Sequence, residues 1–352
     1  MTSLTVDIAI APTKEYETFV DAHPASSLFY TGPYFRFLRQ LFDHKSAECF
    51  ILLAKLETTL VAVLPCVVYR GKYGNVLNSL PFYGSHGGVL SLPNCDPNTI
   101  DALLQRLDHE CLKRQVVSAT LIDNPLQPQQ AELHRNGFNS VDQRTGQMTP
   151  LPKPANGESY SDLLLSMYHS KTRNMVRKAL KANFDFTVDN SKQSLNELVD
   201  WHQKNMQNIG GAAKSAEVFN RLIGNLTPER DFDIFVARQQ GTFAAAVLLL
   251  YSQQIVEYFT PVINDDFRSD QPLSGLIFEA MQRLGQRGFS LWNWGGTWLS
   301  QEGVYRFKSR WGADDKPYQY FSKHYSAEAD IFKQTPETIV REYPYFYVKP
   351  FN

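Results

Sequence analysis

The sequence predicts an α/β (α+β) fold in two domains whose elements follow the same order. Its 352 residues are enough for about two domains of ordinary size. Residues 146–161 contain three closely spaced prolines in a polar setting, which suits neither a helix interior nor a central strand. We therefore expect a first domain over residues 1–150, a second over 151–325, and a tail over 326–352 that can pack back on the first domain.

The first half begins with apolar, β-branched-rich runs and then changes to helical spacing. Residues 57–59 separate the first two runs, which is typical of a hairpin, and Gly137 ends the last helical stretch. The predicted elements are strands over 49–56, 60–69 and 76–80, a helix over 98–115, a strand over 116–122 and a short helix over 128–136.

The second half repeats this order. The hairpin ILLAKLETTLVAVL at residues 51–64 resembles IFVARQQGTFAAAV at residues 234–247, and the matching order of elements favours a tandem duplication. The predicted elements are strands over 232–239, 242–251 and 254–262, a helix over 273–287 and a strand over 289–294.

The second domain carries additional helical sequence between the boundary and its hairpin. Three helices are predicted, over residues 161–183, 194–208 and 216–225, and we find no counterpart for them in the first half. We therefore expect a helical insertion over about 161–226, and such additions often carry function.

Charge and cysteine content exclude several classes of protein. Lys plus Arg number 35 against 36 Asp plus Glu, so an anionic partner needs a local cluster of cations, and the sequence gives no sign of DNA binding. Four cysteines without C-x-x-C spacing favour a reducing, cytoplasmic location. Scattered histidines predict no metal site. No apolar run is long enough to cross a bilayer, which leaves only peripheral membrane contact.

The predicted helix over 161–183 is strongly basic. After Asp162 it contains no acidic residue, while Arg173, Arg177 and Lys181 recur at i, i+4 and i+8 and so form one stripe, with Lys171 nearby. Two interpretations remain open: a solvated helix face, or a seat for phosphate or another polyanion.

The stretch over residues 290–321 is dense in aromatic residues. It holds four of the five tryptophans, and Trp294 is followed at once by Gly295 and Gly296, where a ligand can approach the backbone closely. Tyr305 and Phe307 then alternate with cations. This composition suits an organic phosphate, a sugar or a base, although a core strand followed by a basic turn explains it equally well.

Several ordered motifs resemble the FemAB-like branch of the acyltransferases related to the GNAT superfamily. The resemblance extends roughly from Ser26 to Phe321, and it implies two tandem GNAT-like domains, each a mixed, mainly antiparallel sheet flanked by helices. The motifs are FYTGPYFRFLRQL (29–41), SLPFYGSHGG (79–88), SKTRNMVRKALKANFDF (170–186), HQKNMQNIGGAAKSAEVFNRLI (202–223), SGLIFEAMQRLGQRGFSLWNWGGT (274–297) and GVYRFKSRWGA (303–313).

The resemblance implies an enzyme that transfers an acyl or aminoacyl group from an activated donor to an amine, without a metal. Its best-known members use aminoacyl-tRNA and a peptidoglycan precursor, and others are acetyltransferases. The aromatic-Lys pair of the family matches Phe307 and Lys308, so Lys308 is expected to contact the donor or stabilise charge. Basic residues that hold the acceptor's phosphates have no sure match, and Arg36 or Arg39 is chosen by position only.

The expected donor site departs from the GNAT pattern. GNAT domains that bind acyl-CoA present backbone N–H groups to the pyrophosphate at a glycine-rich helix start. Here the corresponding region has Arg268 and then Ser274 and Gly275, which leaves acyl-CoA, aminoacyl-tRNA and an acylated carrier protein all open as donors. The remaining donor-binding candidates are Trp294, Gly295, Gly296, Tyr305 and Phe307.

Amine attack on an activated acyl group needs a proton acceptor and a donor for the developing oxyanion. Glu257 is the candidate base, because it interrupts an apolar run and burial would raise its pKa. Tyr258 or a water is the alternative. A solvent-facing Glu257 on a half-exposed strand is the competing interpretation.

Two rival functions remain. One is a non-catalytic module that binds RNA or a phosphorylated glycan through the basic helix. The other is an acyltransferase of cell-envelope, exopolysaccharide or lipid-linked sugar assembly, with the aromatic tail over residues 341–352 helping at a membrane face.

Overall fold

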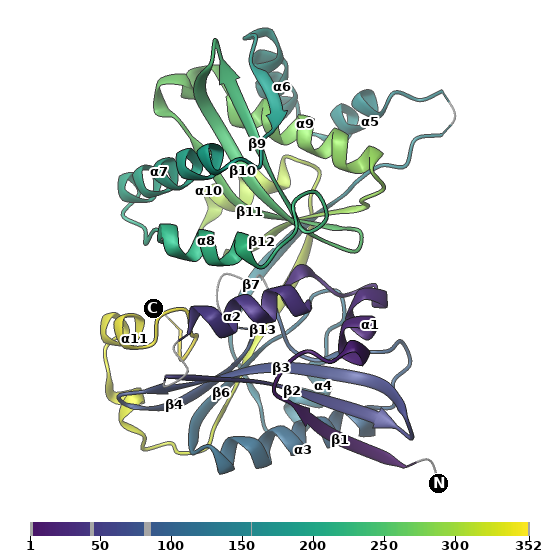
Figure 1. Cartoon of the computed structure of the whole chain (residues 1–352), viewed down its shortest axis with the longest axis vertical. Helices are drawn as coiled ribbons and strands as arrows, with labels where there is room; N and C mark the ends of the chain where they lie inside the picture. The colour runs from purple at the N-terminus through teal and green to yellow at the C-terminus, as the bar shows by residue number, and fades with distance from the viewer. Residues whose placement is uncertain (1–2, 43–45, 81–85, 156, 351–352) are drawn as a thin grey trace. The chain divides into compact units, whose positions relative to one another are not determined.

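A computed structural model describes residues 3–42, 46–80, 86–155 and 157–350 (Figure 1). Within the chain two compact units are found: Met1–Thr145 with Lys316–Asn352, and Gly146–Asp315. The second unit thus ends ten residues before the expected position 325. Of the motifs above, residues 81–85 and 351–352 lie outside the described ranges.

The first unit is built on a mixed sheet. Only β4 and β6 are parallel neighbours, and the other described pairs are antiparallel. The strand order is β1 (Leu4–Ala9), β2 (Ala47–Leu56), β3 (Thr59–Gly71), β4 (Gly74–Ser79), β6 (Val116–Ile122) and β13 (Asp314–His324), with the short β5 (Leu90–Ser91) beside β3.

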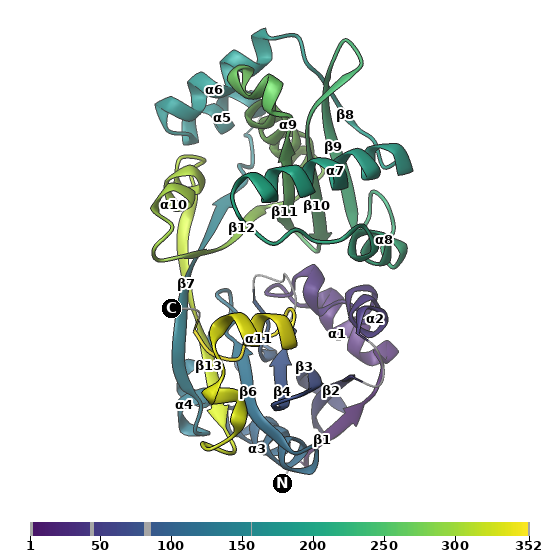
Figure 2. The same cartoon turned by 90° about the vertical axis from the view of Figure 1, so that its left-hand side faces the viewer.

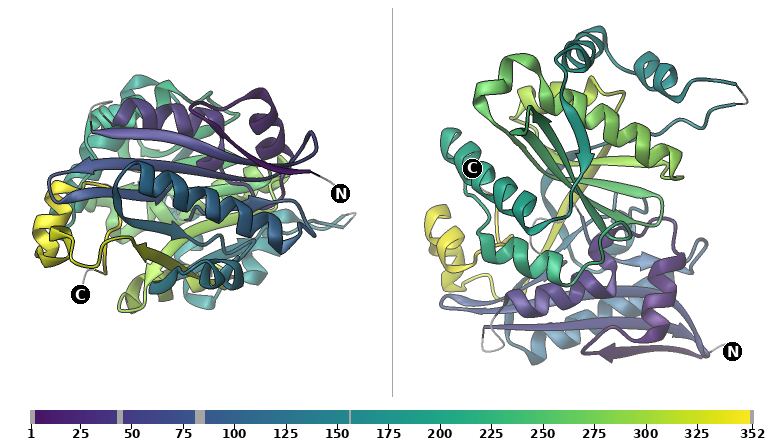
Figure 3. Two further views of the ribbon diagram at one scale, coloured as in Figure 1. Left: turned by 90° about the horizontal axis from the view of Figure 1, so that it is seen from below. Right: turned by 45° about the horizontal axis from the view of Figure 1, so that its top comes forward.

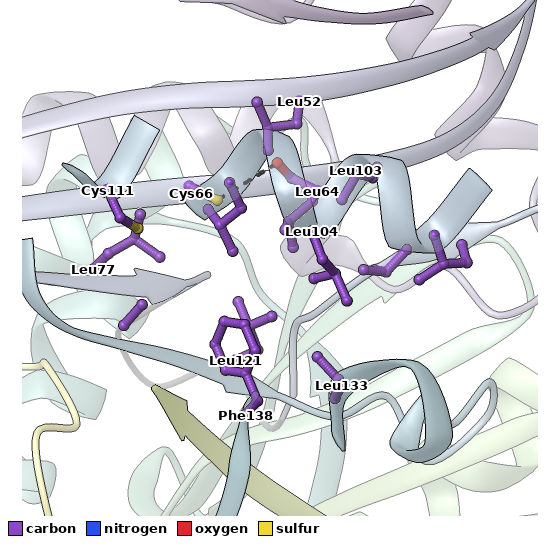
Figure 4. Packing of buried hydrophobic residues seen from close by; sticks show 14 of the residues in the cluster. Leu52, Leu64, Cys66, Leu77, Leu103, Leu104, Cys111, Leu121, Leu133 and Phe138 are labelled. Atoms are coloured by element: carbon purple, nitrogen blue, oxygen red, sulfur yellow. Dashed lines mark hydrogen bonds between the residues drawn. The ribbon is translucent and has the colours of Figure 1, made fainter. Parts of the chain in front are cut away.

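Helix α3 (Pro97–Lys113) covers one face of this sheet and makes its main core. Asp96 caps the helix by accepting the N–H of Asn98, and Pro97 occupies its first turn. Leu103, Leu104 and Cys111 repeat at helical spacing and pack on the buried side chains of the strands, as Figure 4 shows. The other helices of this unit are α1 (Lys14–Ala22), α2 (Gly32–Leu41), α4 (Gln130–Arg135) and α11 (Pro336–Glu342), with 3-10 turns η1 (Leu28–Tyr30) and η3 (Asp330–Lys333).

The C-terminal residues belong to the first unit. Asn78 on β4 donates to the carbonyl of Tyr347 over 2.9 Å and accepts its N–H over 2.8 Å. The hydroxyl of Tyr343 donates to the carbonyl of Gly74 over 2.9 Å. The aromatic residues of this segment are therefore used largely in packing, although Tyr345 is exposed.

The second unit has the strand order β12 (Leu291–Trp298), β11 (Ile255–Ile263), β10 (Thr242–Ser252), β9 (Phe232–Gln239) and β8 (Asp185–Val188). β11 and β12 are parallel and the other pairs are antiparallel. Strand β7 (Asn139–Pro150) enters this unit at Gly146.

Helices cover both faces of the second sheet (Figures 2 and 3). One face packs on α9 (Pro272–Gln286), which α5 (Tyr160–Met167) and α6 (Ser170–Lys181) adjoin; the other packs on α7 (Lys192–Asn208), which adjoins α8 (Ala216–Gly224). Consecutive residues of β10 are therefore buried on alternate sides. The remaining elements are η2 (Asp265–Asp270) and α10 (Glu302–Ser309).

The element order confirms the two tandem, similar halves. In the second unit β8, α7 and α8 occupy the places that β1, α1 and α2 occupy in the first. The helices without a counterpart are therefore α5 and α6 alone, a shorter stretch than the expected 161–226. The single helix predicted over 161–183 is also broken, because Tyr168 is extended and the His169 side chain accepts the N–H of Lys171 as an N-cap.

Candidate active site

The parallel pairing of β11 and β12 ends at a buried carboxylate. Pairs join Ile255–Glu257 to Leu291–Asn293, and no further pair joins these two strands, all of whose residues are described. A bulge between β10 and β11 follows immediately, where Leu248 and Leu249 are opposite Thr260 and Tyr258. The end of a parallel pair beside a bulge is a common place for a binding site.

Glu257 is buried at this point. Its side chain is only 3% exposed, and its Oε1 has no hydrogen-bond partner among the described residues. Burial raises the pKa of Glu257 to about 8, and a hydrogen bond from the Asn293 side chain opposes this rise only in part. Glu257 is therefore an inward-facing group with a free acceptor oxygen, which argues against the interpretation as a solvent-facing residue.

Lys308 is the one residue of α10 that is buried, with 7% exposure. Its Nζ donates to the carbonyls of Gly295 over 3.3 Å and Gly296 over 3.2 Å, and to Thr297 Oγ1 over 2.8 Å. All three acceptors are neutral, and burial lowers the pKa of Lys308 to about 8. The ammonium is thus held in place by dipoles rather than by a carboxylate.

Aromatic rings of β11, β12 and α10 pack against one another around Trp294. Tyr258 lies 4.9 Å from the ring of Trp294, which in turn lies 5.9 Å from Phe307 on α10. The Nε1 of Trp294 donates to Thr149 Oγ1 over 2.9 Å. Burial raises the pKa of Tyr258, so this phenol is poorly suited to act as a base near neutral pH. Tyr305 is exposed, and its hydroxyl donates to Asp315 over 2.9 Å.

The other donor candidates lie at the start of α9. Arg268 forms an ion pair with Asp265 on η2 and is exposed. Ser274 and Gly275 are buried, and a Cβ added to Gly275 would lie 2.6 Å from Phe186 and 2.8 Å from Ala179. Gly275 therefore allows α9 to pack closely against α6 and β8.

The basic stripe of α6 is largely exposed. Lys171, Arg177 and Lys181 have no carboxylate or side-chain hydrogen-bond partner within the described ranges, and all three are exposed. Arg173 differs, because its guanidinium donates to the carbonyl of Tyr168 over 2.6 Å and holds the α5–α6 junction. The N–H of His169 donates to the carbonyl of Arg310 over 2.9 Å, which joins the start of α6 to the end of α10.

Arg36 and Arg39 lie on α2 in the first unit. Arg36 forms an ion pair with Glu17 over 3.4 Å. Arg39 is half-buried and lines a cavity of about 280 Å³ together with Glu48 and Arg70. Arg39 is therefore the better placed of the two to meet an anion.

Two side chains that the sequence did not single out, Lys214 and His202, lie against β11 and on α7, respectively. The Nζ of Lys214 lies 5.1 Å from the ring centroid of Phe259 on β11, and burial lowers the pKa of Lys214 to about 8. The N–H of Lys214 donates to Nε2 of the buried His202 over 3.0 Å, and burial lowers the pKa of His202 to about 4. Lys214 and Asn293 lie within the motifs over residues 202–223 and 274–297, but nothing in the sequence assigned either of them a role.

No group of three or more His, Cys, Asp or Glu side chains in the described ranges is arranged to hold a metal ion. Within the part of the chain that the structure describes, every helix is too short or too polar to cross a bilayer.

Comparisons with known proteins agree with this architecture. Residues 168–309 match the family model of the acetyltransferase (GNAT) domain. A search of curated proteins finds no match. These matched residues include Glu257, Asn293 and Lys308.

Solved structures resemble nearly the whole chain. FemX is 13% identical with a TM-score of 0.72, covering 89% of this chain and 96% of its own. A tandem GNAT protein from the clavulanic acid biosynthesis pathway is 10% identical with a TM-score of 0.54, covering 93% and 100%. L-PGS from Bacillus licheniformis is 13% identical with a TM-score of 0.52, covering 89% and 91%. Residues 168–309 thus resemble an acetyltransferase (GNAT) domain, and the chain as a whole has a FemAB-like tandem GNAT fold.

Proposed function

We propose that the second unit transfers an acyl or aminoacyl group from an activated donor to an amine, with Glu257 as base and Lys308 as the stabilising charge. The observation that carries this proposal is that two neighbouring strands hold two buried charged groups: β11 carries the Glu257 carboxylate with its free Oε1, and β12 binds the Lys308 ammonium. Both groups have pKa values of about 8, close to the range in which proton transfer is most efficient.

In this mechanism the neutral amine attacks the carbonyl carbon and forms the new C–N bond. Oε1 of Glu257 accepts the proton that the nitrogen loses, and the carboxylic acid then returns it to the departing thiol or hydroxyl as the C–S or C–O bond breaks. All three N–H groups of Lys308 are already used. The two longer bonds, to the carbonyls of Gly295 and Gly296, are the ones that it can exchange for the developing oxyanion.

The donor that the site favours is an aminoacyl-tRNA. The start of α9 offers few free N–H groups to a pyrophosphate, since Pro272 has none and the Gln271 carbonyl accepts those of Ser274 and Gly275. Exposed cations on α6 instead suit a nucleic-acid backbone, and the bond from His169 to Arg310 links that helix to α10. Acyl-CoA and an acylated carrier protein are the alternative donors.

The acceptor is proposed to be an amine that also carries an anionic group, such as a cell-envelope or polysaccharide precursor. Lys214 supplies a half-buried positive charge over the ring of Phe259, which lies two residues along β11 from Glu257. In the first unit, Arg39, which lines a cavity, is a second candidate for binding the anionic group of the acceptor. Free cysteines at all four positions support a cytoplasmic location, where thiols stay reduced.

A second candidate function is a non-catalytic module that binds RNA through α6. The exposed Lys171, Arg177 and Lys181 favour it, because cations without a carboxylate partner bind polyanions well. RNA binding through α6 needs neither Glu257 nor Lys308, so it does not explain why these two charged groups are buried.

One experiment separates these functions. Purified chain is incubated with radiolabelled aminoacyl-tRNA, acetyl-CoA or an acylated carrier protein and a panel of amino sugars and peptidoglycan-precursor peptides. Label transfer to an amine that is lost in Lys308→Met supports the proposal. Binding of tRNA with no transfer from any donor would favour the binding module.

A further inference from the structure

We propose that Asn293 is a positioning residue that sets the Gly295–Gly296 backbone to hold Lys308. The proposal rests on the proposed function, since the part that Lys308 plays in transfer is itself proposed. It concerns a chain of contacts within β12 and α10, and neither the sequence motifs nor the family match assigns a role to Asn293.

The first link is a local turn inside β12. Oδ1 of Asn293 accepts the N–H of Gly295 over 2.8 Å, so the side chain bonds its own backbone two residues on. Asn and Asp favour this arrangement, because their short side chains reach the i+2 N–H without strain. Asn293 is 1% exposed, so this bond is shielded from water.

The second link is the backbone of Gly295. Its φ of 71° lies in the left-handed region, which glycine adopts readily and other residues rarely do. In a regular strand, successive carbonyls point to opposite sides. Here the carbonyls of Gly295 and Gly296 both accept from Lys308 Nζ, at 3.3 and 3.2 Å. The turn at Gly295 therefore aims two consecutive carbonyls at one ammonium.

The third link is Glu257. Because Oδ1 of Asn293 is engaged by Gly295, its amide nitrogen is the group that hydrogen-bonds the Glu257 carboxylate. Asn293 thus touches the proposed base on one side and fixes the backbone that holds Lys308 on the other. Gly295 and Gly296, which the sequence suggested as donor-binding residues, act in this account by holding Lys308.

Competitive labelling with acetic anhydride tests the proposal without any substrate. The extent of Lys308 acetylation, measured by peptide mass spectrometry across a pH series, gives the pKa of this amine. In the wild type we expect a midpoint near 8. In Asn293→Ala the turn is lost and Lys308 is released towards water, so its midpoint should rise towards about 10.4, the ordinary value for lysine.

Two further variants and a control make the result decisive. Gly295→Ala disfavours the left-handed φ, so it should raise the Lys308 midpoint even if Asn293→Ala fails to fold. Asn293→Ser keeps a neutral oxygen for the Gly295 N–H and should leave the Lys308 midpoint near its wild-type value. Asn205→Ala removes an asparagine that holds the backbone of Ile263 instead, and it should leave the midpoint unchanged.

Transfer assays on the same variants distinguish this proposal from the proposed function. A folded Asn293→Ala or Gly295→Ala variant whose Lys308 midpoint matches the wild type would overturn the positioning role, whatever its activity. A shifted midpoint supports the positioning role even where wild-type chain transfers no label, a result that would count against the proposed function alone.

Discussion

Glu257 faces Asn293 in the last pair of the parallel ladder between β11 and β12. The Glu257 side chain is only 3% exposed, and burying a carboxylate costs free energy unless it is hydrogen-bonded or protonated. Its Oε1 has no hydrogen-bond partner in the described ranges. The strands form no further pair with each other beyond this point, and Oε1 of Glu257 is the group there that remains able to accept a hydrogen bond from a ligand.

The pH dependence of transfer should be narrow. Activity should rise as Glu257 loses its proton with a pKa of about 8, and fall as Lys308 loses its proton with a pKa of about 8, which places the maximum near pH 8. Glu257→Gln should lower kcat by about 10²–10⁴-fold and abolish the acid limb. Measuring kcat/KM for both proteins from about pH 6 to about pH 10, a range that spans the pKa values of Glu257 and Lys308, checks this prediction. An acid limb that persists in the variant would assign the base elsewhere.

The stability of the protein should also report the Glu257 proton. The folded-state pKa of Glu257, about 8, lies above the ordinary value of 4.5, so the folded state holds a proton that the unfolded state releases between these values. The free energy of unfolding should therefore fall as pH rises from about 5 to 8, by up to about 1.4 kcal/mol per pKa unit. Lys308 stays protonated in both states over most of this window.

Glu257→Gln has no proton to release and should lose this pH-dependent fall. Urea unfolding of the wild type and the variant at a series of pH values is the measurement. Parallel pH curves for the two proteins would mean that Glu257 is ionised in the folded state throughout.

Neutralising the exposed stripe of α6 should weaken RNA binding. Lys171→Gln, Arg177→Gln and Lys181→Gln together should reduce the slope of log affinity against log salt by about 2–3, since each phosphate contact contributes about 0.7–0.9. A salt titration of tRNA binding measures this slope. Three exposed lysines elsewhere, Lys113, Lys153 and Lys192, changed to Gln serve as the charge-matched control. An equal reduction of the slope in both triple variants would show that α6 is not a specific binding site for RNA.

Gly275→Ala should destabilise the second unit. The added Cβ would meet Phe186 at 2.6 Å and Ala179 at 2.8 Å, and such overpacking costs about 1–3 kcal/mol. Gly224→Ala on α8 is the matched control, because a Cβ there meets nothing within 4 Å and alanine favours the helix. In chemical denaturation, the denaturant concentration at the unfolding midpoint should therefore be lower than in the wild type for Gly275→Ala only. An unchanged midpoint would show that α6 and α9 are not closely packed at this point.

Local patterning predicted most of the regular elements. The predicted helix over 98–115 corresponds to α3, and the strand over 116–122 to β6, because in both the apolar period is set by a buried face. β7 and β13 were not predicted: their sequences are polar and partly exposed, and a strand of this kind depends on its neighbours rather than on its own pattern.

The candidate site was only partly visible in the sequence. Glu257 stood out as a charge in an apolar run, and Lys308 through the family resemblance. Asn293 and Lys214 lie within motifs of that resemblance but had no assigned role, because their contacts depend on which strand lies beside them and on where a loop returns. Spatial pairing of this kind is not encoded in any short window of sequence.

Single-turnover transfer by Lys308→Met is the most direct test of the central claim. The account predicts that the rate of labelled acyl transfer at pH 8 falls by about 10²–10³-fold, because a positive charge at the developing oxyanion is lost. The melting temperature should not fall, and Lys192→Met on α7 should match the wild type. A folded Lys308→Met variant that transfers label at the wild-type rate would contradict the account.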